Sequence, residues 1–183
     1  GLSCRTAQGT PDVMRGEETQ LLGVVETGGN AFWVLPGTHS KWALTANGRI
    51  EGFATYMTGE IYAVLREHSI LGRLMPAAPH ADQMAFHRGV RYGLSADAEL
   101  SRKLFSVRTL GLFGEVPVDG LADYFSGLLL GAEVRDALSQ WPSAAEIGLI
   151  GEPGLCERYR MALEIAGVHA RTDATNATPR GLW

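Results

Sequence analysis

The chain has 183 residues, of which 45% are hydrophobic and 20% are charged, and its formal net charge is −4. This is the composition of a globular protein, with enough residues for one domain or one large lobe. Lys and Arg residues form no stripe along the sequence, so nucleic acid is not an expected partner, whereas an anionic ligand needs only a few local donors. The sequence contains no run of 18 apolar residues, which a membrane-spanning helix would need, and no signal-peptide pattern.

The cysteine and histidine residues show no metal-ligand spacing. Cys4 and Cys156 stand in unrelated contexts, and we interpret them as reduced thiols of a cytoplasmic protein. His68, His80 and His87 lack the spacing of ligands on one helix face. We therefore predict no metal held by protein ligands alone.

The N-terminus begins with Gly1 in place of Met and soon reaches a loop-like stretch, residues 6–12. We expect a fragment of a longer protein, although N-terminal processing or removal of a tag would give the same first residue.

The first third of the chain reads as a helix followed by strands. Acidic residues in the first turn favour a helix that begins near Gly16, within residues 14–25. Residues 31–35 are a short apolar run typical of a buried strand. Asn47-Gly48 between the strand-like runs 42–45 and 50–56 predicts a β-hairpin.

The middle of the chain has helical periodicity, interrupted by a proline-containing loop at 75–82. The predicted helices cover residues 59–71, 82–92, 95–105 and 121–140. Asp119 is the expected N-cap of the last helix. The apolar positions of that helix are expected on one face: Leu121, Phe125, Leu128, Leu129 and Ala132.

The last third predicts a strand-turn-helix-strand unit. Residues 146–150 read as a buried strand and residues 155–166 as a helix that ends at Gly167. A short strand over 168–171 and a polar, partly helical tail over 173–183 follow. The chain is therefore an α/β protein with a mixed sheet, and its closing unit has the shape of a nucleotide-binding βαβ element.

Arg15-Gly16-Glu17-Glu18 places two carboxylates at a predicted helix start. One of them could act as general base towards a substrate hydroxyl. Spacing alone favours the simpler interpretation, in which both carboxylates complement the helix dipole.

Pro36-Gly37-Thr38-His39-Ser40-Lys41 leads from a strand into a glycine turn with two hydroxyls. Such a turn exposes backbone N–H groups that can bind phosphate, although the P-loop spacing is missing. The alternative is an ordinary loop with a surface lysine.

Gly151-Glu152-Pro153-Gly154 lies between a predicted strand and a predicted helix, where glycine permits close approach of a ligand. The spacing is not that of a dinucleotide site, and an ordinary βα turn is the simpler interpretation.

Together, five segments resemble the 2-dehydro-3-deoxygalactonokinases. They are MRGEETQLLG at 14–23, PGTHSKW at 36–42, MTGE at 57–60, LFSVRT at 104–109 and FSGLLLGAEV at 125–134. The resemblance implies an actin/hexokinase-like (ribonuclease H-like) kinase fold. It also implies transfer of the ATP γ-phosphoryl group to the 6-hydroxyl of 2-dehydro-3-deoxy-D-galactonate, with Mg²⁺ on the phosphates, in galactonate catabolism.

The resemblance also implies roles for individual residues. Gly16-Glu17 stands where related carbohydrate kinases have a Gly-Asp segment with the catalytic carboxylate. Glu17 is therefore the first candidate for the base and Glu18 the second. A Glu side chain is one bond longer than the Asp of the related kinases, which shifts the position of the carboxylate. The other implied contacts are Gly37, Thr38, His39 and Ser40 for the ATP phosphates, Gly151 and Gly154 for adenosine, and Arg15 for the substrate. Glu152-Pro153 departs from the paired glycines of the family.

The family opens with an Asp-x-Gly-x-Thr-like hairpin that has no counterpart here. We therefore expect residues 1–183 to form the C-terminal lobe of a two-lobed kinase, with most of the N-terminal lobe missing and no kinase activity alone. A related carbohydrate kinase with another sugar, or a non-catalytic binding domain, remains the alternative. The expected partners are the sugar acid and ATP, and a homo-oligomer stays open.

Overall fold

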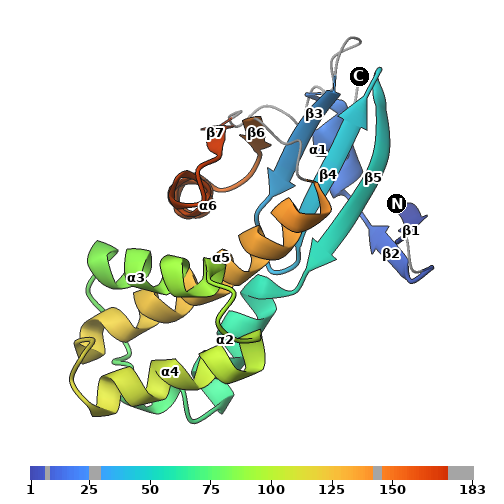
Figure 1. Cartoon of the computed structure of the whole chain (residues 1–183). Coiled ribbons are helices and arrows are strands. Elements are labelled where there is room, and N and C mark those ends of the chain that lie inside the picture. The colour runs from blue at the N-terminus through green and yellow to red at the C-terminus, as the bar shows by residue number, and fades with distance from the viewer. Residues whose placement is uncertain (7–8, 25–29, 142–145, 173–183) are drawn as a thin grey trace. The chain divides into compact units, whose positions relative to one another are not determined.

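The structure is a computed structural model that describes residues 1–6, 9–24, 30–141 and 146–172 (Figure 1). The chain divides into two compact units. The first contains residues 1–57, 143–160 and 168–183, and the second contains residues 58–142 and 161–167. The predicted partly helical tail, 173–183, lies outside the described residues.

A five-stranded mixed sheet forms the centre of the first unit, in the order β5-β4-β3-β6-β7. The strands are β3 (Asn30–Leu35), β4 (Ser40–Ala46), β5 (Arg49–Tyr56), β6 (Glu146–Leu149) and β7 (His169–Thr172). The pairs β3–β4 and β4–β5 are antiparallel, whereas β3–β6 and β6–β7 are parallel. The predicted α/β class, the mixed sheet and the predicted strands are confirmed.

The β4–β5 hairpin turns at Asn47-Gly48 as predicted. Both residues have positive φ, 51° and 79°, which is the backbone of a type I′ turn and explains why Asn-Gly is favoured there. The register shifts between Leu44 and Thr45, so that Lys41 pairs with Thr55.

The N-terminal segment forms a β-hairpin that the sequence did not predict. β1 (Leu2–Arg5) pairs antiparallel with β2 (Pro11–Met14), and the loop-like interpretation of residues 6–12 is wrong for the last two residues. The reason is a distant contact, because Thr55 of β5 donates two hydrogen bonds to the Asp12 carboxylate.

The helix predicted within residues 14–25 begins as expected after Gly16 but is short. α1 covers Glu17–Leu22, and Gly23 and Val24 continue as a turn. Its Leu21 is buried in the core of the first unit with these partners: Met14, Trp33, Leu35, Ala43, Phe53 and Ile150.

The second unit is helical. Its elements are α2 (Thr58–His68), the 3₁₀ turn η1 (Gly72–Leu74), α3 (Gln83–Leu94), α4 (Leu100–Leu112), the 3₁₀ turn η2 (Val118–Gly120) and α5 (Leu121–Gln140). The helix predicted at 95–105 therefore begins five residues late. Lys103 and Arg135 both donate to the carbonyl of Ser95, which holds this residue in an extended conformation after α3.

The prediction that Asp119 is the N-cap of α5 is wrong. Asp119 lies within η2, and Gly120 precedes α5 in a helical conformation without a side-chain cap. By contrast, Asp82 is extended and its carboxylate accepts the N–H of Ala85 at 2.9 Å, so it caps α3. An N-cap needs this extended backbone, which the preceding 3₁₀ turn denies to Asp119.

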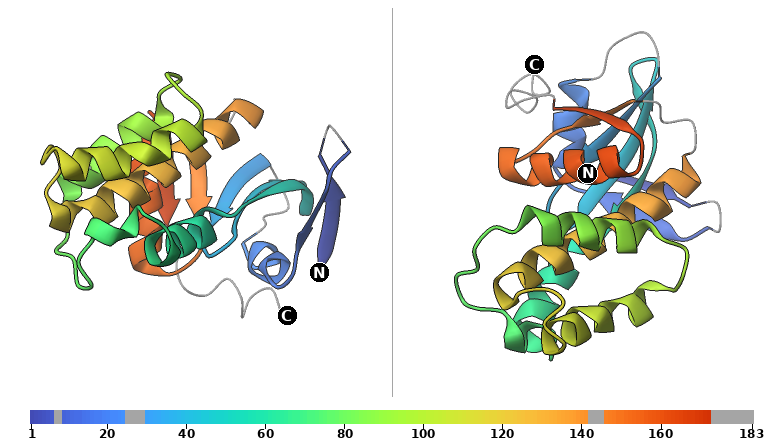
Figure 2. Two further views of the ribbon diagram at one scale, coloured as in Figure 1. Left: turned by 90° about the horizontal axis from the view of Figure 1, so that it is seen from below. Right: turned by 60° about the vertical axis from the view of Figure 1, so that its left-hand side comes forward.

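The buried side of α5 is wider than the single face predicted for it, and Ala132 is only half-buried. The buried residues of the helix include Ala122, Tyr124, Leu130, Glu133 and Val134 in addition to the four predicted leucine and phenylalanine positions. Helices α3 and α5 lie side by side in both figures (Figures 1 and 2). Small residues permit this approach: a Cβ at Gly127 of α5 would lie under 3.0 Å from the carbonyl oxygen of Phe86 of α3.

The helix between β6 and β7 is confirmed. α6 covers Pro153–Ile165 and begins two residues earlier than predicted, with proline in its first position. Among the described residues, no helix is long and apolar enough to cross a membrane.

Candidate active site

A hollow of about 430 Å³ lies in the first unit, where three sequence segments meet. α1 contributes Glu17 and Gln20, the end of β3 and the connection to β4 contribute residues 35–39, and the segment after β6 contributes residues 150–152. The parallel pairing of β3 with β6 explains this meeting, because the carboxyl ends of parallel strands lie at the same edge of a sheet.

The β3–β4 connection presents polar groups to this hollow. Pro36 ends the strand, and a Cβ added to Gly37 would meet no heavy atom within 4 Å, so the backbone there is open on that side. Thr38 and His39 are exposed. Ser40 is fully buried and its Oγ donates to the carbonyl of Tyr56 at 3.4 Å. The structure therefore brings Gly37, Thr38 and His39 to the hollow and directs Ser40 elsewhere.

The two adjacent carboxylates have different surroundings. The Oε2 atom of Glu17 accepts the N–H of Arg15 at 2.9 Å, and this side chain lines the hollow while 28% exposed. The Oε2 atom of Glu18 accepts the N–H of Gly16 at 2.6 Å, and Oε1 lies 3.0 Å from the terminal nitrogen of Gly1.

Glu18 is thus held by its own neighbours. Burial raises its pKa, but hydrogen bonds from the terminal ammonium and from the backbone N–H groups of Glu18 and Gly16 outweigh it. The pKa of this carboxyl is lowered as a result. Neither Glu18 nor the exposed Arg15 lines the hollow, so the geometry favours Glu17 of the two base candidates.

Lys41 is not the surface lysine that the alternative interpretation assumed, because it is only 5% exposed. Its Nζ donates to the carbonyl of Val13 at 3.0 Å and to Oγ1 of Thr55 at 2.8 Å, and it lies 4.0 Å from Oε1 of Glu17. The sequence pattern pointed to neither this lysine nor its partners Asp12 and Thr55. The predicted hairpin would not have revealed the Lys41–Thr55 pair, because the register shifts between Leu44 and Thr45.

The turn before α6 is closed by its own side chain. Oε1 of Glu152 accepts the N–H of Gly154 at 2.9 Å, and Oε2 accepts the N–H of Leu155 at 2.7 Å. These two backbone hydrogen bonds lower the pKa of Glu152. Gly151 and Glu152 line the hollow, whereas Gly154 does not. The first-turn amides of α6, which otherwise suit an anion, are therefore occupied by a carboxylate of the chain itself.

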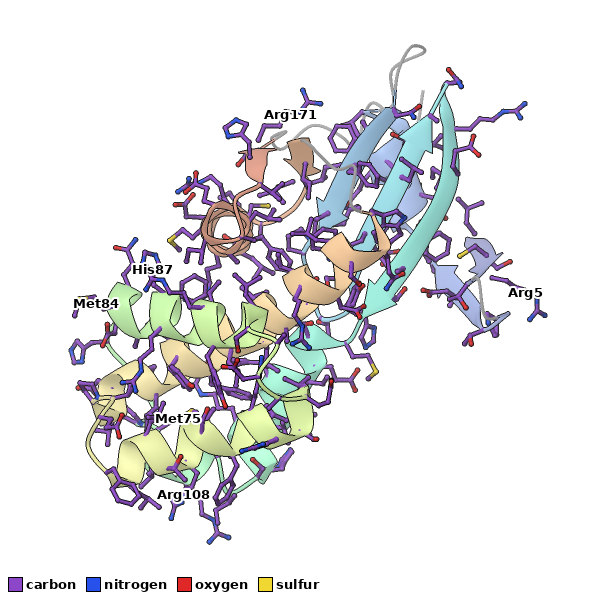
Figure 3. All side chains as sticks on the ribbon, in the orientation of Figure 1. Arg5, Met75, Met84, His87, Arg108 and Arg171 are labelled. Carbon is purple, nitrogen blue, oxygen red and sulfur yellow. The ribbon has the colours of Figure 1, made fainter. Side chains whose placement is uncertain are left out.

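Two other side chains of the first unit, those of Arg171 and Cys156, have contacts with the structure around them. The guanidinium of Arg171 on β7, labelled in Figure 3, lies 5.4 Å from the ring centre of Trp33. Cys156 of α6 is fully buried, and burial followed by the charge of Glu152 raises the pKa of its thiol. A second hollow of about 450 Å³ in the other unit is lined by residues between 62 and 77 and contains none of the predicted site residues.

The hollow thus combines the carboxylate of Glu17 with an open glycine turn and nearby hydroxyl and imidazole groups. A carboxylate can accept a proton from an attacking hydroxyl, and backbone N–H groups of a glycine turn can bind phosphate oxygens. These are the two requirements of phosphoryl transfer to an alcohol, a reaction in which positioning and charge stabilisation dominate.

Comparison with known proteins points to one family. The family model described as 2-keto-3-deoxy-galactonokinase matches residues 1–183. A probable 2-dehydro-3-deoxygalactonokinase of Rhizobium meliloti (strain 1021) is 41% identical over 178 residues, which are 94% of this chain and 58% of that protein. The 2-dehydro-3-deoxygalactonokinase of Escherichia coli (strain K12) is 35% identical over 164 residues, 90% of this chain and 56% of that protein.

A solved structure is similar over the entire chain. The crystal structure of a Sinorhizobium meliloti protein, provisionally assigned as a 2-dehydro-3-deoxygalactonokinase, has a TM-score of 0.90 and 38% sequence identity. The match covers 100% of this chain and 62% of the chain in that crystal structure. The chain therefore spans a little more than half the length of the relatives it matches.

Proposed function

The chain belongs to the 2-keto-3-deoxy-galactonokinase family, and on that premise we propose that it is part of an ATP-dependent kinase for 2-dehydro-3-deoxy-D-galactonate. The phosphoryl acceptor in this proposal is the 6-hydroxyl group of the sugar acid. The observation that supports it most directly is the meeting of Glu17 with Gly37, Thr38 and His39 around one hollow.

Glu17 is the general base of the proposed reaction. Its carboxylate accepts the proton of the 6-hydroxyl while the hydroxyl oxygen attacks the γ-phosphorus of ATP, and ADP leaves with the electrons of the broken P–O bond. General-base assistance of this kind contributes about 100- to 10,000-fold in rate. Glu18 is not the base in this proposal, because one of its oxygens accepts the N–H of Gly16 and its side chain does not line the hollow.

The phosphates of ATP bind along the β3–β4 connection in this proposal. Gly37 leaves room for close approach, and Thr38 supplies a hydroxyl donor. The α6 side suits the nucleoside better, because Glu152 already occupies the amides of Gly154 and Leu155 and its charge opposes a phosphate. Mg²⁺ would neutralise phosphate charge, and it commonly binds through substrate phosphates with one or two carboxylates.

We extend the proposal to the architecture: residues 1–183 are the C-terminal lobe of a two-lobed actin/hexokinase-like kinase, and residues outside this chain complete the sugar-acid site. The mixed sheet with flanking helices fits such a lobe. Since the chain covers 58% and 56% of the two curated relatives, activity is expected from a protein of the relatives' length and not from this chain alone.

The test is ATP-dependent phosphorylation of 2-dehydro-3-deoxy-D-galactonate by this chain and by a version extended to the relatives' length. Glu17→Gln in the extended protein is expected to lower kcat about 100-fold or more while ATP binding persists. Glu18→Gln is the matched control and is expected to retain most of the turnover.

Other outcomes would redirect or reject the proposal. Phosphorylation of a different sugar by the extended protein would keep the kinase and replace the substrate. An extended protein that neither binds ATP nor turns over any sugar would indicate a non-catalytic binding domain. Equal activity of Glu17→Gln and wild type would remove Glu17 as the base.

A further inference from the structure

A buried ammonium group lies directly behind the candidate base. Lys41 of β4 is 5% exposed, and a buried charge is costly unless it is paired and hydrogen-bonded. Its Nζ has three N–H donors. Two of them reach the carbonyl of Val13 and Oγ1 of Thr55, at 3.0 and 2.8 Å.

The position of this ammonium is fixed by a carboxylate on the N-terminal hairpin. Oδ1 of Asp12 accepts the hydroxyl proton of Thr55 at 2.6 Å, and Oδ2 accepts the N–H of Thr55 at 2.8 Å. Since the Thr55 hydroxyl donates to Asp12, its lone pairs face Lys41, which donates to them. The direction of every hydrogen bond in the Asp12–Thr55–Lys41 chain is thereby determined.

The Lys41 ammonium also lies beside the candidate base. Its Nζ is 4.0 Å from Oε1 of Glu17, and the other oxygen of that carboxylate accepts the N–H of Arg15. The carboxylate thus has contacts on two sides, while the Glu17 side chain is 28% exposed and lines the hollow.

We propose that Lys41 is a positioning residue for Glu17: its ammonium, oriented by Asp12 through Thr55, holds the Glu17 carboxylate at the hollow. The catalytic consequence rests on the proposed kinase function, whereas the coupling between the two side chains does not. A purely structural role, in which Lys41 only joins β2 to β5, predicts lower stability without any effect on the behaviour of Glu17.

The first experiment uses the 183-residue chain and needs no activity. Chemical unfolding midpoints are measured for wild type, Lys41→Met, Glu17→Gln and the double variant. Lys41→Met is expected to lower the midpoint less in the Glu17→Gln background than in wild type, because residues in contact show non-additive effects. Additive shifts would overturn the proposal.

Lys103 provides the matched control. It is a fully buried lysine of the second unit, and its Nζ donates to the carbonyls of Tyr92, Gly93 and Ser95. Lys103→Met is expected to lower the midpoint equally with Glu17 or Gln at position 17. Should Lys41→Met fail to fold, Lys41→Arg keeps the charge and is expected to retain part of the coupling, and complete loss of coupling in a folded Lys41→Arg would count against the proposal.

The second experiment measures kcat and KM in the protein of the relatives' length. Lys41→Met is expected to lower kcat about 10- to 100-fold, the cost of a misplaced group, with KM for ATP within about twofold. An unchanged kcat would overturn the proposal, and Lys41→Arg is expected to restore part of the lost kcat.

Other titratable groups around Glu17 are accounted for by the same comparison. His39 and Glu152 line the same hollow, Asp12 lies behind Lys41, and Glu18 and Arg15 are chain neighbours. All of them remain in the Lys41 variants, and Lys103→Met should leave kcat unchanged. If the wild-type protein has no kinase activity, the proposed function fails, while the double-variant cycle still decides whether Lys41 positions Glu17.

Discussion

Helices α3 and α5 are packed so closely that a single added methyl group should disrupt them. A Cβ on Gly127 would lie under 3.0 Å from the carbonyl oxygen of Phe86, a separation that real Cβ atoms essentially never show. Gly131 faces the carbonyl of Val90 in the same way, and Gly89 faces that of Tyr124. Because backbone cannot rotate aside, the substitution Gly127→Ala must move one helix away from the other.

The expected magnitude follows from two opposing effects. Alanine is favoured over glycine within a helix by up to about 1 kcal/mol. Overpacking costs about 1 to 3 kcal/mol, and a clash with backbone belongs at the upper end of this range. The net expectation is a loss of about 2 kcal/mol in the free energy of unfolding, with a further loss if Gly89 and Gly131 also separate from the opposite helix.

Chemical denaturation of the 183-residue chain followed by circular dichroism measures this loss. Gly111→Ala on α4 is the matched control, because a Cβ there meets the terminal carbons of Leu121 and Leu74, which can rotate away. The control is expected within about 1 kcal/mol of wild type, the size of the helix-propensity gain. A Gly127→Ala variant as stable as the wild type would refute the close-packing argument.

Two further predictions concern α6. Glu152→Ala should lower the Tm at pH 7. Hydrogen bonds from Gly154 and Leu155 lower the pKa of Glu152 in the folded state. The contribution of Glu152 to stability is therefore present above the ordinary pKa range of Glu and is lost as pH falls through the folded pKa. The Tm difference between the variant and wild type should shrink by pH 3, and a constant difference would contradict this. The thiol of Cys156 is buried and has a raised pKa, whereas Cys4 is half-buried. A thiol reagent at pH 8 should therefore label Cys4 first, which peptide mass spectrometry would show. Early labelling of Cys156 would contradict its burial.

Local sequence signals were sufficient for most elements of the sheet. The apolar run of β3 and the Asn-Gly turn between β4 and β5 are short-range features, and both were found where predicted. The β1–β2 hairpin was missed because its strands are short and Asp12 depends on Thr55, which is 43 residues away in sequence. The start of α4 was misplaced for a similar reason, since Lys103 and Arg135 hold Ser95 outside the helix.

The partner of Lys41 illustrates a different limit. If the strands paired without interruption from the Asn47-Gly48 turn, Lys41 would lie opposite Ala54. The side chain of Thr55 would then point to the other face of the sheet from Lys41. The register shift between Leu44 and Thr45 moves the pairing by one residue and brings Thr55 opposite Lys41. Because side chains alternate between faces, this one bulge decides whether the Lys41 ammonium has a hydroxyl partner. Nothing in the local residue types announces it.

The choice between Glu17 and Glu18 was open in the sequence and depends on the turn that precedes them. Gly16 has φ 115°, a backbone conformation that L side chains rarely adopt. With the chain turned in this way, Glu18 folds back onto the N–H of Gly16, whereas Glu17 lines the hollow beside Gly37. A glycine next to two similar carboxylates therefore gives them different environments, and only Glu17 of the two lines the hollow.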